Sequence, residues 1–259
     1  MNSLTLLDAR DTVIGRAESE GAVALTVERA YQPGDRLVMR SDEKACYASV
    51  SALLSPAYLY LPGGEAVFHI PTEPESLRAY APLAFRGLLH TFTLAPAPLS
   101  AAVYRNLALN PLCQREFAGA YPFVSANVET RDESVFFARN VIDGCTQNNS
   151  HGDWPYQSWG IGLSEKAEIT LEFGREVEVD RMMLTLRADF PHDAYWKQAT
   201  VRLSDGWEQT FPLEKSARAQ VVDFGESHRI TSLTLTKLVK EVMESPFPAL
   251  TEWEVWGRG

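Results

Sequence analysis

The side chains best suited to ligand chemistry are concentrated in residues 187–196. This segment holds a guanidinium, an imidazole, carboxylates and aromatic rings, namely Arg187, Asp189, His192, Asp193, Tyr195 and Trp196. Charged groups form strong hydrogen bonds to hydroxyls, and aromatic rings pack against apolar C–H faces. The combination is typical of a site for a polar ligand with apolar faces, such as a sugar.

A second segment of the same kind lies at residues 151–160. It adds an imidazole and two aromatic rings to the candidate ligand-binding residues, which are His151, Trp154 and Tyr156. We expect both segments to lie at one end of the same β-sandwich, because loops on a rigid scaffold commonly carry binding residues. Trp159, which is followed by Gly-Ile-Gly, is expected in the core instead. The alternative for the first segment is structural: Arg187 would pair with an aspartate of its own loop.

Strand patterns on both sides indicate that residues 187–198 form a long loop. Apolar and more polar residues alternate before it, at Met182, Leu184 and Leu186, and after it, at Ala199, Val201 and Leu203. This period of two is typical of half-buried strands. Residues 169–173 alternate in the same way and are expected to turn at Gly174, and residues 252–256 form a closing strand.

The first part of the chain also reads as short strands. Val23, Leu25 and Val27 alternate with polar residues, and two further apolar runs, residues 57–61 and 66–70, flank Pro62-Gly-Gly64. Glycines between two strands favour a tight turn, so these runs predict a β-hairpin.

Composition divides the chain into two all-β domains. We expect a β-sandwich domain at residues 1–95, a Pro- and Ala-rich connector at residues 96–123 that lies against a domain, and a second sandwich at residues 124–259. The connector is expected to hold one short helix within residues 101–110. Frequent glycines between short strands favour a sandwich or jelly roll over a parallel sheet with crossover helices.

Sequence motifs of the second domain occur in the order found in one family. They are Asn140-Val-Ile-Asp-Gly144, the region of Trp154 and Trp159, Leu171-Glu-Phe-Gly174, Leu203-Ser-Asp-Gly-Trp207 and the ending Leu250-Thr-Glu-Trp-Glu-Val-Trp-Gly257. Residues 124–257 thereby resemble discoidin-like modules, which include the C domains of coagulation factors and galactose-binding-like carbohydrate-binding modules. The resemblance implies an eight-stranded antiparallel jelly roll with ligand loops at one end. Two departures are Glu172, where the family has Asp, and a longer segment at residues 145–153.

The resemblance also implies a structural calcium near the Asp-Gly turn. The matching positions here are Asp143 and Glu252. Calcium is bound by six to eight oxygen atoms, so these two carboxylates would need nearby carbonyl groups as well. The alternative is that Asp143 accepts a hydrogen bond within its own turn and that Glu252 is a solvated strand residue.

Charge and cysteine usage restrict the partners and the compartment. The formal net charge is −10 with a pI near 5.1, and Lys and Arg form no stripe, so nucleic acid is not an expected partner. No window is apolar enough to span a membrane, and residues 1–8 lack the features of a leader. Cys46, Cys113 and Cys145 show no metal-binding spacing and fit a reducing environment. We therefore expect a cytoplasmic protein.

The function expected from these patterns is non-catalytic binding of a carbohydrate or similar polyhydroxylated ligand. One alternative is an intracellular sugar-active enzyme using the same loops, with Asp189 and either Asp193 or Asp153 as its acids, although no hydrolase or metalloenzyme motif is present. Another is an interaction scaffold or homo-oligomer formed through aromatic residues of the first domain, Tyr58, Tyr60 and Phe68.

Overall fold

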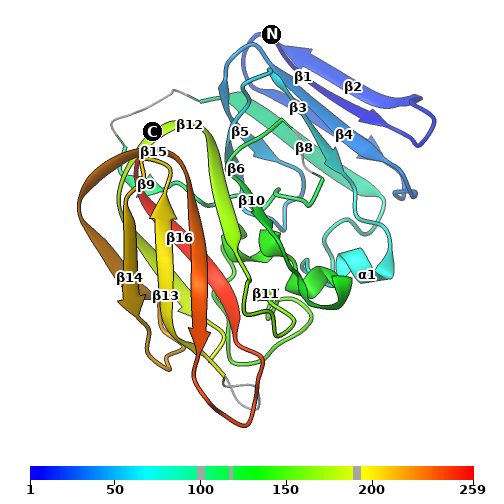
Figure 1. Ribbon diagram of the computed structural model, residues 1–259. Coiled ribbons are helices and arrows are strands. Elements are labelled where there is room, and N and C mark those ends of the chain that lie inside the picture. Colours follow the sequence, from blue (N-terminus) through cyan, green and yellow to red (C-terminus); the bar gives the residue numbers. More distant parts are fainter. Residues whose placement is uncertain (98–102, 117–118, 189–193) are drawn as a thin grey trace.

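The computed structural model describes residues 1–97, 103–116, 119–188 and 194–259, and it is built almost entirely of antiparallel β-strands (Figure 1). Two β-sandwiches lie against each other, one blue to cyan and one yellow to red. Each has its own core of buried apolar side chains. The expected all-β fold class is confirmed.

The N-terminal sandwich consists of two four-stranded sheets with the orders β2-β1-β4-β7 and β3-β8-β5-β6. Its strands are β1 (Asn2–Leu7), β2 (Val13–Ser19), β3 (Val23–Glu28), β4 (Arg36–Ser41), β5 (Ala45–Ser49), β6 (Ala57–Tyr60), β7 (Glu65–His69) and β8 (Leu89–Pro96). In β3, Val23, Leu25 and Val27 are buried and their neighbours are exposed, as the alternation predicts.

The predicted hairpin of residues 57–70 is wrong. β6 pairs with β5 and β7 pairs with β4, so the glycine turn connects the two opposite sheets. The reason is burial: Leu59 of β6 and Phe68 of β7 both fill the core between the sheets. A flat hairpin would leave one layer of that core uncovered.

One short helix of the N-terminal half was missed by the sequence patterns. Helix α1 (Pro74–Leu77) follows β7 and has proline in its first turn. In the connector, the described residues form strand β9 (Arg105–Asn106) rather than the predicted helix, because Asn106 and Arg105 pair with the last strand, β16.

The C-terminal sandwich is built around one continuous network of strands, in the order β11-β16-β12-β15-β13-β14, with β10 on β12 and β9 on β16. Its strands are β10 (Phe123–Ala126), β11 (Trp159–Gly160), β12 (Ile169–Leu186), β13 (Trp196–Leu203), β14 (Glu208–Pro212), β15 (Gln220–Lys240) and β16 (Ala249–Arg258). The predicted turn at Gly174 is wrong, since β12 continues through it. Gly174 has a positive φ of 66°, and the pairing register shifts between Glu172 and Val177, so the strand bends without ending.

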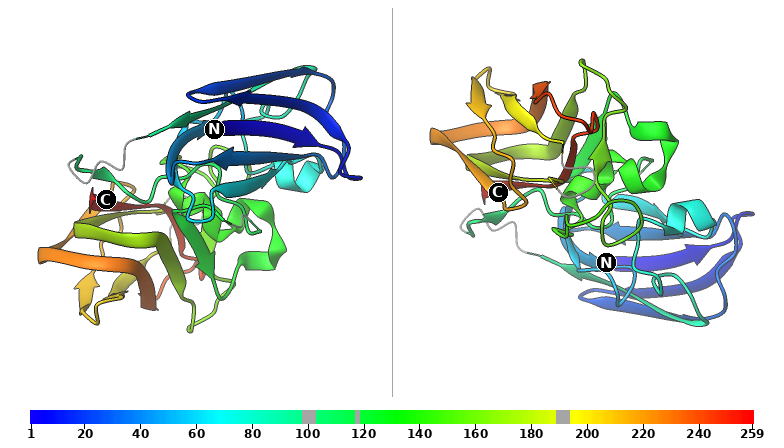
Figure 2. Two further views of the ribbon diagram at one scale, coloured as in Figure 1. Left: turned by 90° about the horizontal axis from the view of Figure 1, so that it is seen from above. Right: turned by 90° about the horizontal axis from the view of Figure 1, so that it is seen from below.

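Three short 3-10 helices precede β11 and lie between α1 and the C-terminal sheet (Figure 2). They are η1 (Thr130–Asp132), η2 (Ser134–Phe136) and η3 (Ala138–Ile142). This places a cluster of loops of the C-terminal sandwich beside the N-terminal half. No helix in the described part of the chain is long and apolar enough to cross a membrane.

The contact between the halves covers part of the aromatic surface considered for a scaffold. Phe68 is fully buried in the N-terminal core. The guanidinium of Arg105 lies 3.8 Å from the ring centroid of Tyr58, and that of Arg175 lies 4.9 Å from the ring centroid of Tyr60. Tyr58 and Tyr60 therefore contribute to the contact between the two halves.

Candidate functional site

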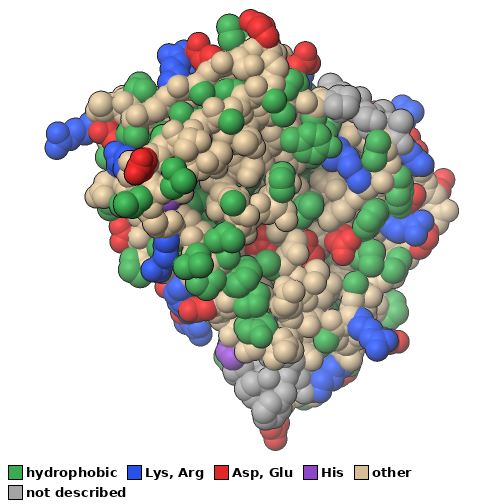
Figure 3. Space-filling view, turned by 180° about the vertical axis from the view of Figure 1, so that it is seen from behind, with side chains coloured by type: hydrophobic (Ala, Val, Ile, Leu, Met, Phe, Trp, Pro, Cys, Tyr) green, Lys and Arg blue, Asp and Glu red, His purple; other side chains and the backbone are tan. Residues whose placement is uncertain are grey.

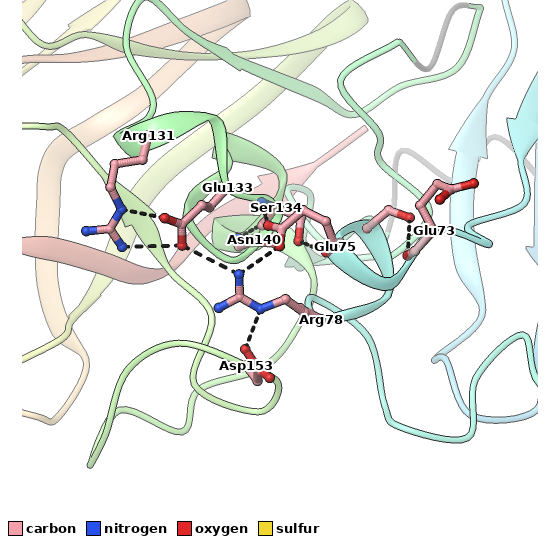
Figure 4. Close-up of polar contacts among 9 residues, drawn as sticks. Glu73, Glu75, Arg78, Arg131, Glu133, Ser134, Asn140 and Asp153 are labelled. Carbon is pink, nitrogen blue, oxygen red and sulfur yellow. Dashed lines mark hydrogen bonds and ion pairs between the residues drawn. The ribbon is translucent and has the colours of Figure 1, made fainter.

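A cleft of about 520 Å³ lies where the 3-10 helices, the 151–156 loop and α1 meet. Aromatic side chains and charged groups of both signs line it: Arg78, Arg131, Glu133, Phe136, His151, Asp153, Trp154 and Tyr156, with Gly152 between them. Figure 4 shows the charged members converging from separate segments of the chain. The three sequence candidates of the 151–160 segment, His151, Trp154 and Tyr156, are thus brought together.

The 151–156 loop presents Trp154 to the cleft. Trp154 is 37% exposed, which is unusual for the tryptophans of this chain, since Trp159, Trp196 and Trp253 are fully buried. Its backbone N–H donates to the carbonyl of Arg78 at 2.8 Å, and the N–H of Tyr156 donates to the carbonyl of Asp153 at 3.1 Å. The loop is therefore held by its backbone while the indole ring remains accessible.

Arg78 occupies the centre of the charged cluster. Its guanidinium donates to Asp153 at 2.7 Å and to Glu75 at 2.8 Å, and it lies 3.5 Å from Glu133. The hydrogen bonds from Arg78 to Glu75 and Asp153 raise the pKa of this already basic group further. A permanently charged planar donor therefore faces the cleft.

A second arginine pairs with the other carboxylate of the cleft. Arg131, in η1, donates to both carboxylate oxygens of Glu133. The hydrogen bond from Arg131, opposed by partial burial and assisted by Arg78, lowers the pKa of Glu133. Glu133 is therefore a carboxylate at neutral pH and accepts hydrogen bonds.

The helices that carry these residues are fixed against the buried end of β11. Asn140, which is fully buried, donates through its side-chain amide to the carbonyls of Ser134 at 2.9 Å and Ser158 at 3.2 Å. At Gly160, a Cβ atom would lie only 2.6 Å from the hydroxyl of Thr130, so glycine allows η1 to approach the strand. The cleft wall thus rests on a rigid support.

A smaller cleft of about 120 Å³ adjoins the first and shares Arg131, Phe136 and His151 with it. Arg187 lines this second cleft, together with the apolar residues Ile161, Leu163, Phe247, Pro248 and Ala249. Arg187 is only 4% exposed, and its guanidinium donates to the carbonyl of Phe247 at 2.7 Å. His151 and Arg187 therefore line one concavity, and Arg187 also has a structural role.

The remaining candidates of the 187–196 segment do not join this cleft in the described structure. The prediction that Trp196 contacts a ligand is wrong. Its side chain is 1% exposed and packs against Trp159, with ring centroids 6.1 Å apart. The pairing of β13 with β15 shifts register between Trp196 and Gln198 and again before Thr200, which turns the indole to the core side. Asp189, His192 and Asp193 lie outside the described residues.

The carboxylates expected to hold calcium, those of Asp143 and Glu252, are both buried at the Asp-Gly turn and already accept hydrogen bonds there. Both oxygens of Asp143 accept hydrogen bonds, from the N–H of Cys145 at 2.9 Å and from Gln157 at 2.8 Å. The guanidinium of Arg139 lies 3.8 Å from Asp143 and supplies positive charge to the pair. Among the described residues, no three His, Cys, Asp or Glu side chains gather as a metal site.

Glu252 accepts a hydrogen bond from the N–H of Gly144 at 3.2 Å. Burial, reinforced by the nearby Asp143, raises its pKa well above the ordinary value, and burial likewise raises the pKa of Asp143. In the absence of a cation, a buried carboxyl with a raised pKa favours its neutral form, whereas calcium would bind the charged form. The contacts that Asp143 and Glu252 make in the described structure are those of an internal hydrogen-bonded cluster.

Several cleft residues were not among the sequence candidates: Arg78, Arg131, Glu133, Phe136 and, as a binding residue, Asp153. Arg131-Asp-Glu133 is a local run of charged residues, but no neighbouring aromatic or turn motif indicated a binding site there. No sequence pattern indicated Arg78, because it lies in the other half of the chain. On the face drawn in Figure 3, Lys and Arg side chains are scattered among Asp and Glu rather than gathered in a stripe.

Comparison with known proteins finds similarity in structure only. The sequence matches no protein-family model and no curated protein. Solved structures similar to the chain include a chitosan-binding module from Paenibacillus sp. IK-5 (18% identity, 59% of this chain and 99% of that chain, TM-score 0.41). A family 32 carbohydrate-binding module from Clostridium perfringens in complex with galactose is similar at 17% identity, over 51% of this chain and 91% of that chain, with TM-score 0.39.

A fucose-binding module from Streptococcus pneumoniae is similar at 12% identity, over 60% of this chain and 99% of that chain, with TM-score 0.41. All three of these structures are carbohydrate-binding modules, the class that the sequence motifs resemble. At these identities and TM-scores the ligands named belong to those proteins alone.

Proposed function

We propose that this protein binds a neutral carbohydrate, or a similar polyhydroxylated ligand, in the cleft beside Trp154 and does not transform it. The observation that carries the proposal is the exposed indole of Trp154 flanked by two guanidinium groups and two carboxylates. An aromatic ring packs against the C–H face of a sugar, and the charged groups exchange hydrogen bonds with its hydroxyls.

The balance of charge supports a neutral ligand. Arg78 pairs with Asp153, and Arg131 pairs with Glu133, so the cleft lining holds two guanidinium groups and two carboxylates. A strongly anionic or cationic ligand would meet a group of its own sign. Adjacent hydroxyls of a sugar can donate to a carboxylate and accept from a guanidinium at once.

The lowered pKa of Glu133 supports a role as a hydrogen-bond acceptor rather than as the general acid of a glycoside hydrolase. General acid catalysis of glycoside cleavage requires a carboxyl whose pKa is raised, whereas the pKa of Glu133 is lowered by its hydrogen bonds from Arg131 and Arg78. The proposal includes a reducing compartment such as the cytoplasm, which the unpaired state of Cys46, Cys113 and Cys145 supports.

Calorimetric titration with galactose, glucose, fucose and N-acetylglucosamine tests the proposal. Trp154→Ala should weaken binding about thirtyfold, since truncating an aromatic hot spot costs roughly 2 kcal/mol. Tyr47→Ala is the matched control, because Tyr47 is an exposed aromatic residue that does not line the cleft. The proposal fails if none of these sugars binds or if Trp154→Ala binds as tightly as the control. Sugar conversion detected by NMR would favour the enzyme alternative instead.

A further inference from the structure

The cleft beside Trp154 is built by both halves of the protein. Its residues between Arg131 and Tyr156 come from the C-terminal half, whereas Arg78 comes from the N-terminal half, directly after α1. Figure 4 shows Arg78 reaching from the α1 segment between Glu133 and Asp153. One of the two guanidinium groups in the cleft therefore depends on how the halves are docked.

The α1 segment is seated on the C-terminal half by specific hydrogen bonds. The backbone N–H of Ser134 donates to the carboxylate of Glu75 at 3.0 Å, and the hydroxyl of Ser134 donates to the Glu75 carbonyl. Ser134 begins η2, the same short helix that carries Phe136 into the cleft. Docking of α1 and the position of the cleft wall are thus linked through one residue.

Arg78 also holds the loop that presents the indole ring. Its carbonyl accepts the N–H of Trp154 at 2.8 Å, and its guanidinium binds the carboxylate of Asp153 at 2.7 Å. Two successive residues of the loop are therefore fixed by a single residue of the N-terminal half. Within the described structure, these contacts hold the 153–154 backbone directly at the cleft.

We infer that the N-terminal sandwich is a working part of the carbohydrate site, with Arg78 as the positioning residue that couples ligand binding to docking of the two halves. The inference rests on the proposed function and extends it, because a ligand in the cleft would contact groups from both halves. A ligand that binds only the docked arrangement stabilises that arrangement, and docking in turn raises affinity by the same factor.

The test compares Arg78→Ala with Arg40→Ala in the full chain. Arg40 lies in the same sandwich and also pairs with a glutamate, Glu65, but it is remote from the cleft lining. Sugar affinity is measured by calorimetry with the sugars named above. Arg78→Ala should bind about tenfold more weakly, as expected for the loss of one charge-assisted hydrogen bond, and Arg40→Ala should bind as the wild type does.

Amide hydrogen exchange tests whether Arg78 positions the 153–154 loop, as distinct from stabilising the whole fold, and its first part needs no ligand. Without sugar, the Trp154 amide should exchange faster in Arg78→Ala than in the wild type or Arg40→Ala. The backbone carbonyl that accepts the Trp154 N–H remains in this variant, but the guanidinium that holds the neighbouring Asp153 is lost. With sugar, the Ser134 amide, which donates to Glu75, should be further protected in the wild type and less so in Arg78→Ala.

The outcomes distinguish the two proposals. If the wild type binds sugar and Arg78→Ala matches it in affinity and exchange, the coupling is refuted and the proposed function stands. If the wild type binds no sugar, the proposed function fails, and the sugar-free exchange at Trp154 still decides whether Arg78 positions the loop.

Discussion

Replacement of Trp196 by alanine should destabilise the protein without acting on the ligand cleft. The side chain is 1% exposed and lies in the C-terminal core beside Trp159. Removing a buried tryptophan ring leaves a cavity and costs roughly 3–5 kcal/mol of unfolding free energy. For a protein of this size each kcal/mol corresponds to about 2–4 °C, so the melting temperature should fall by roughly 6–20 °C.

The comparison with Trp154→Ala makes this prediction specific. Trp154 is 37% exposed, and its truncation should change the unfolding free energy by only about 0.5 kcal/mol, as is usual for surface positions. Calorimetric melting and urea unfolding of the two variants should therefore separate them clearly. A Trp196→Ala variant that melts within about 2 °C of the wild type but loses sugar binding would refute the assignment of Trp196 to the core.

Two further predictions concern the buried polar groups. Glu252→Gln keeps an acceptor for the Gly144 N–H and removes a titrating group whose pKa is raised. The protonated carboxyl of Glu252 stabilises the fold fully at pH values below its ordinary pKa of 4.5, and this contribution is lost as pH rises through the higher pKa of the folded state. The free energy of unfolding of Glu252→Gln should therefore increase relative to that of the wild type as pH rises. Melting curves between pH 4 and 8 measure this, and a rise in wild-type melting temperature on adding calcium after EDTA treatment would contradict it. Arg187→Ala should lower stability by about 1–3 kcal/mol, because it removes a buried guanidinium and its hydrogen bond to the Phe247 carbonyl. Unchanged melting with weakened sugar affinity would instead make Arg187 a ligand contact.

Alternation of apolar residues was enough to predict the strands and the all-β class, but it did not predict which strands pair with one another. The alternation of β3 matches its burial residue by residue. The same pattern in β6 and β7 predicted a hairpin, because a single strand's burial does not reveal which sheet it joins. Pairing depends on distant strands, and no local signal carried that information.

The candidate site was predictable only where its residues are close in sequence. His151, Trp154 and Tyr156 were found because an imidazole, a carboxylate and aromatic rings lie within six residues of one another there. Trp196 stands in an equally promising setting, yet register shifts in β13 turn it inward, and a shift of one residue moves a side chain to the other face. Arg78 could not be found, because its partner Asp153 lies in the other half of the chain.

Arginine side chains of each half contact residues of the other half, and these contacts differ in how far they are buried. Arg139 of the C-terminal half lies 4.6 Å from the ring centroid of Tyr80, and Arg105 lies 3.8 Å from that of Tyr58. The Arg139–Tyr80 contact is buried, since each residue is 6% exposed, and the Arg105–Tyr58 contact is half-buried. The Arg78–Asp153 pair is instead partly exposed, with Asp153 65% exposed, and such pairs contribute little net stability and are screened by salt. The Arg78–Asp153 pair therefore costs less to rearrange than the buried Arg139–Tyr80 contact, which is what the inferred coupling of ligand binding to docking requires.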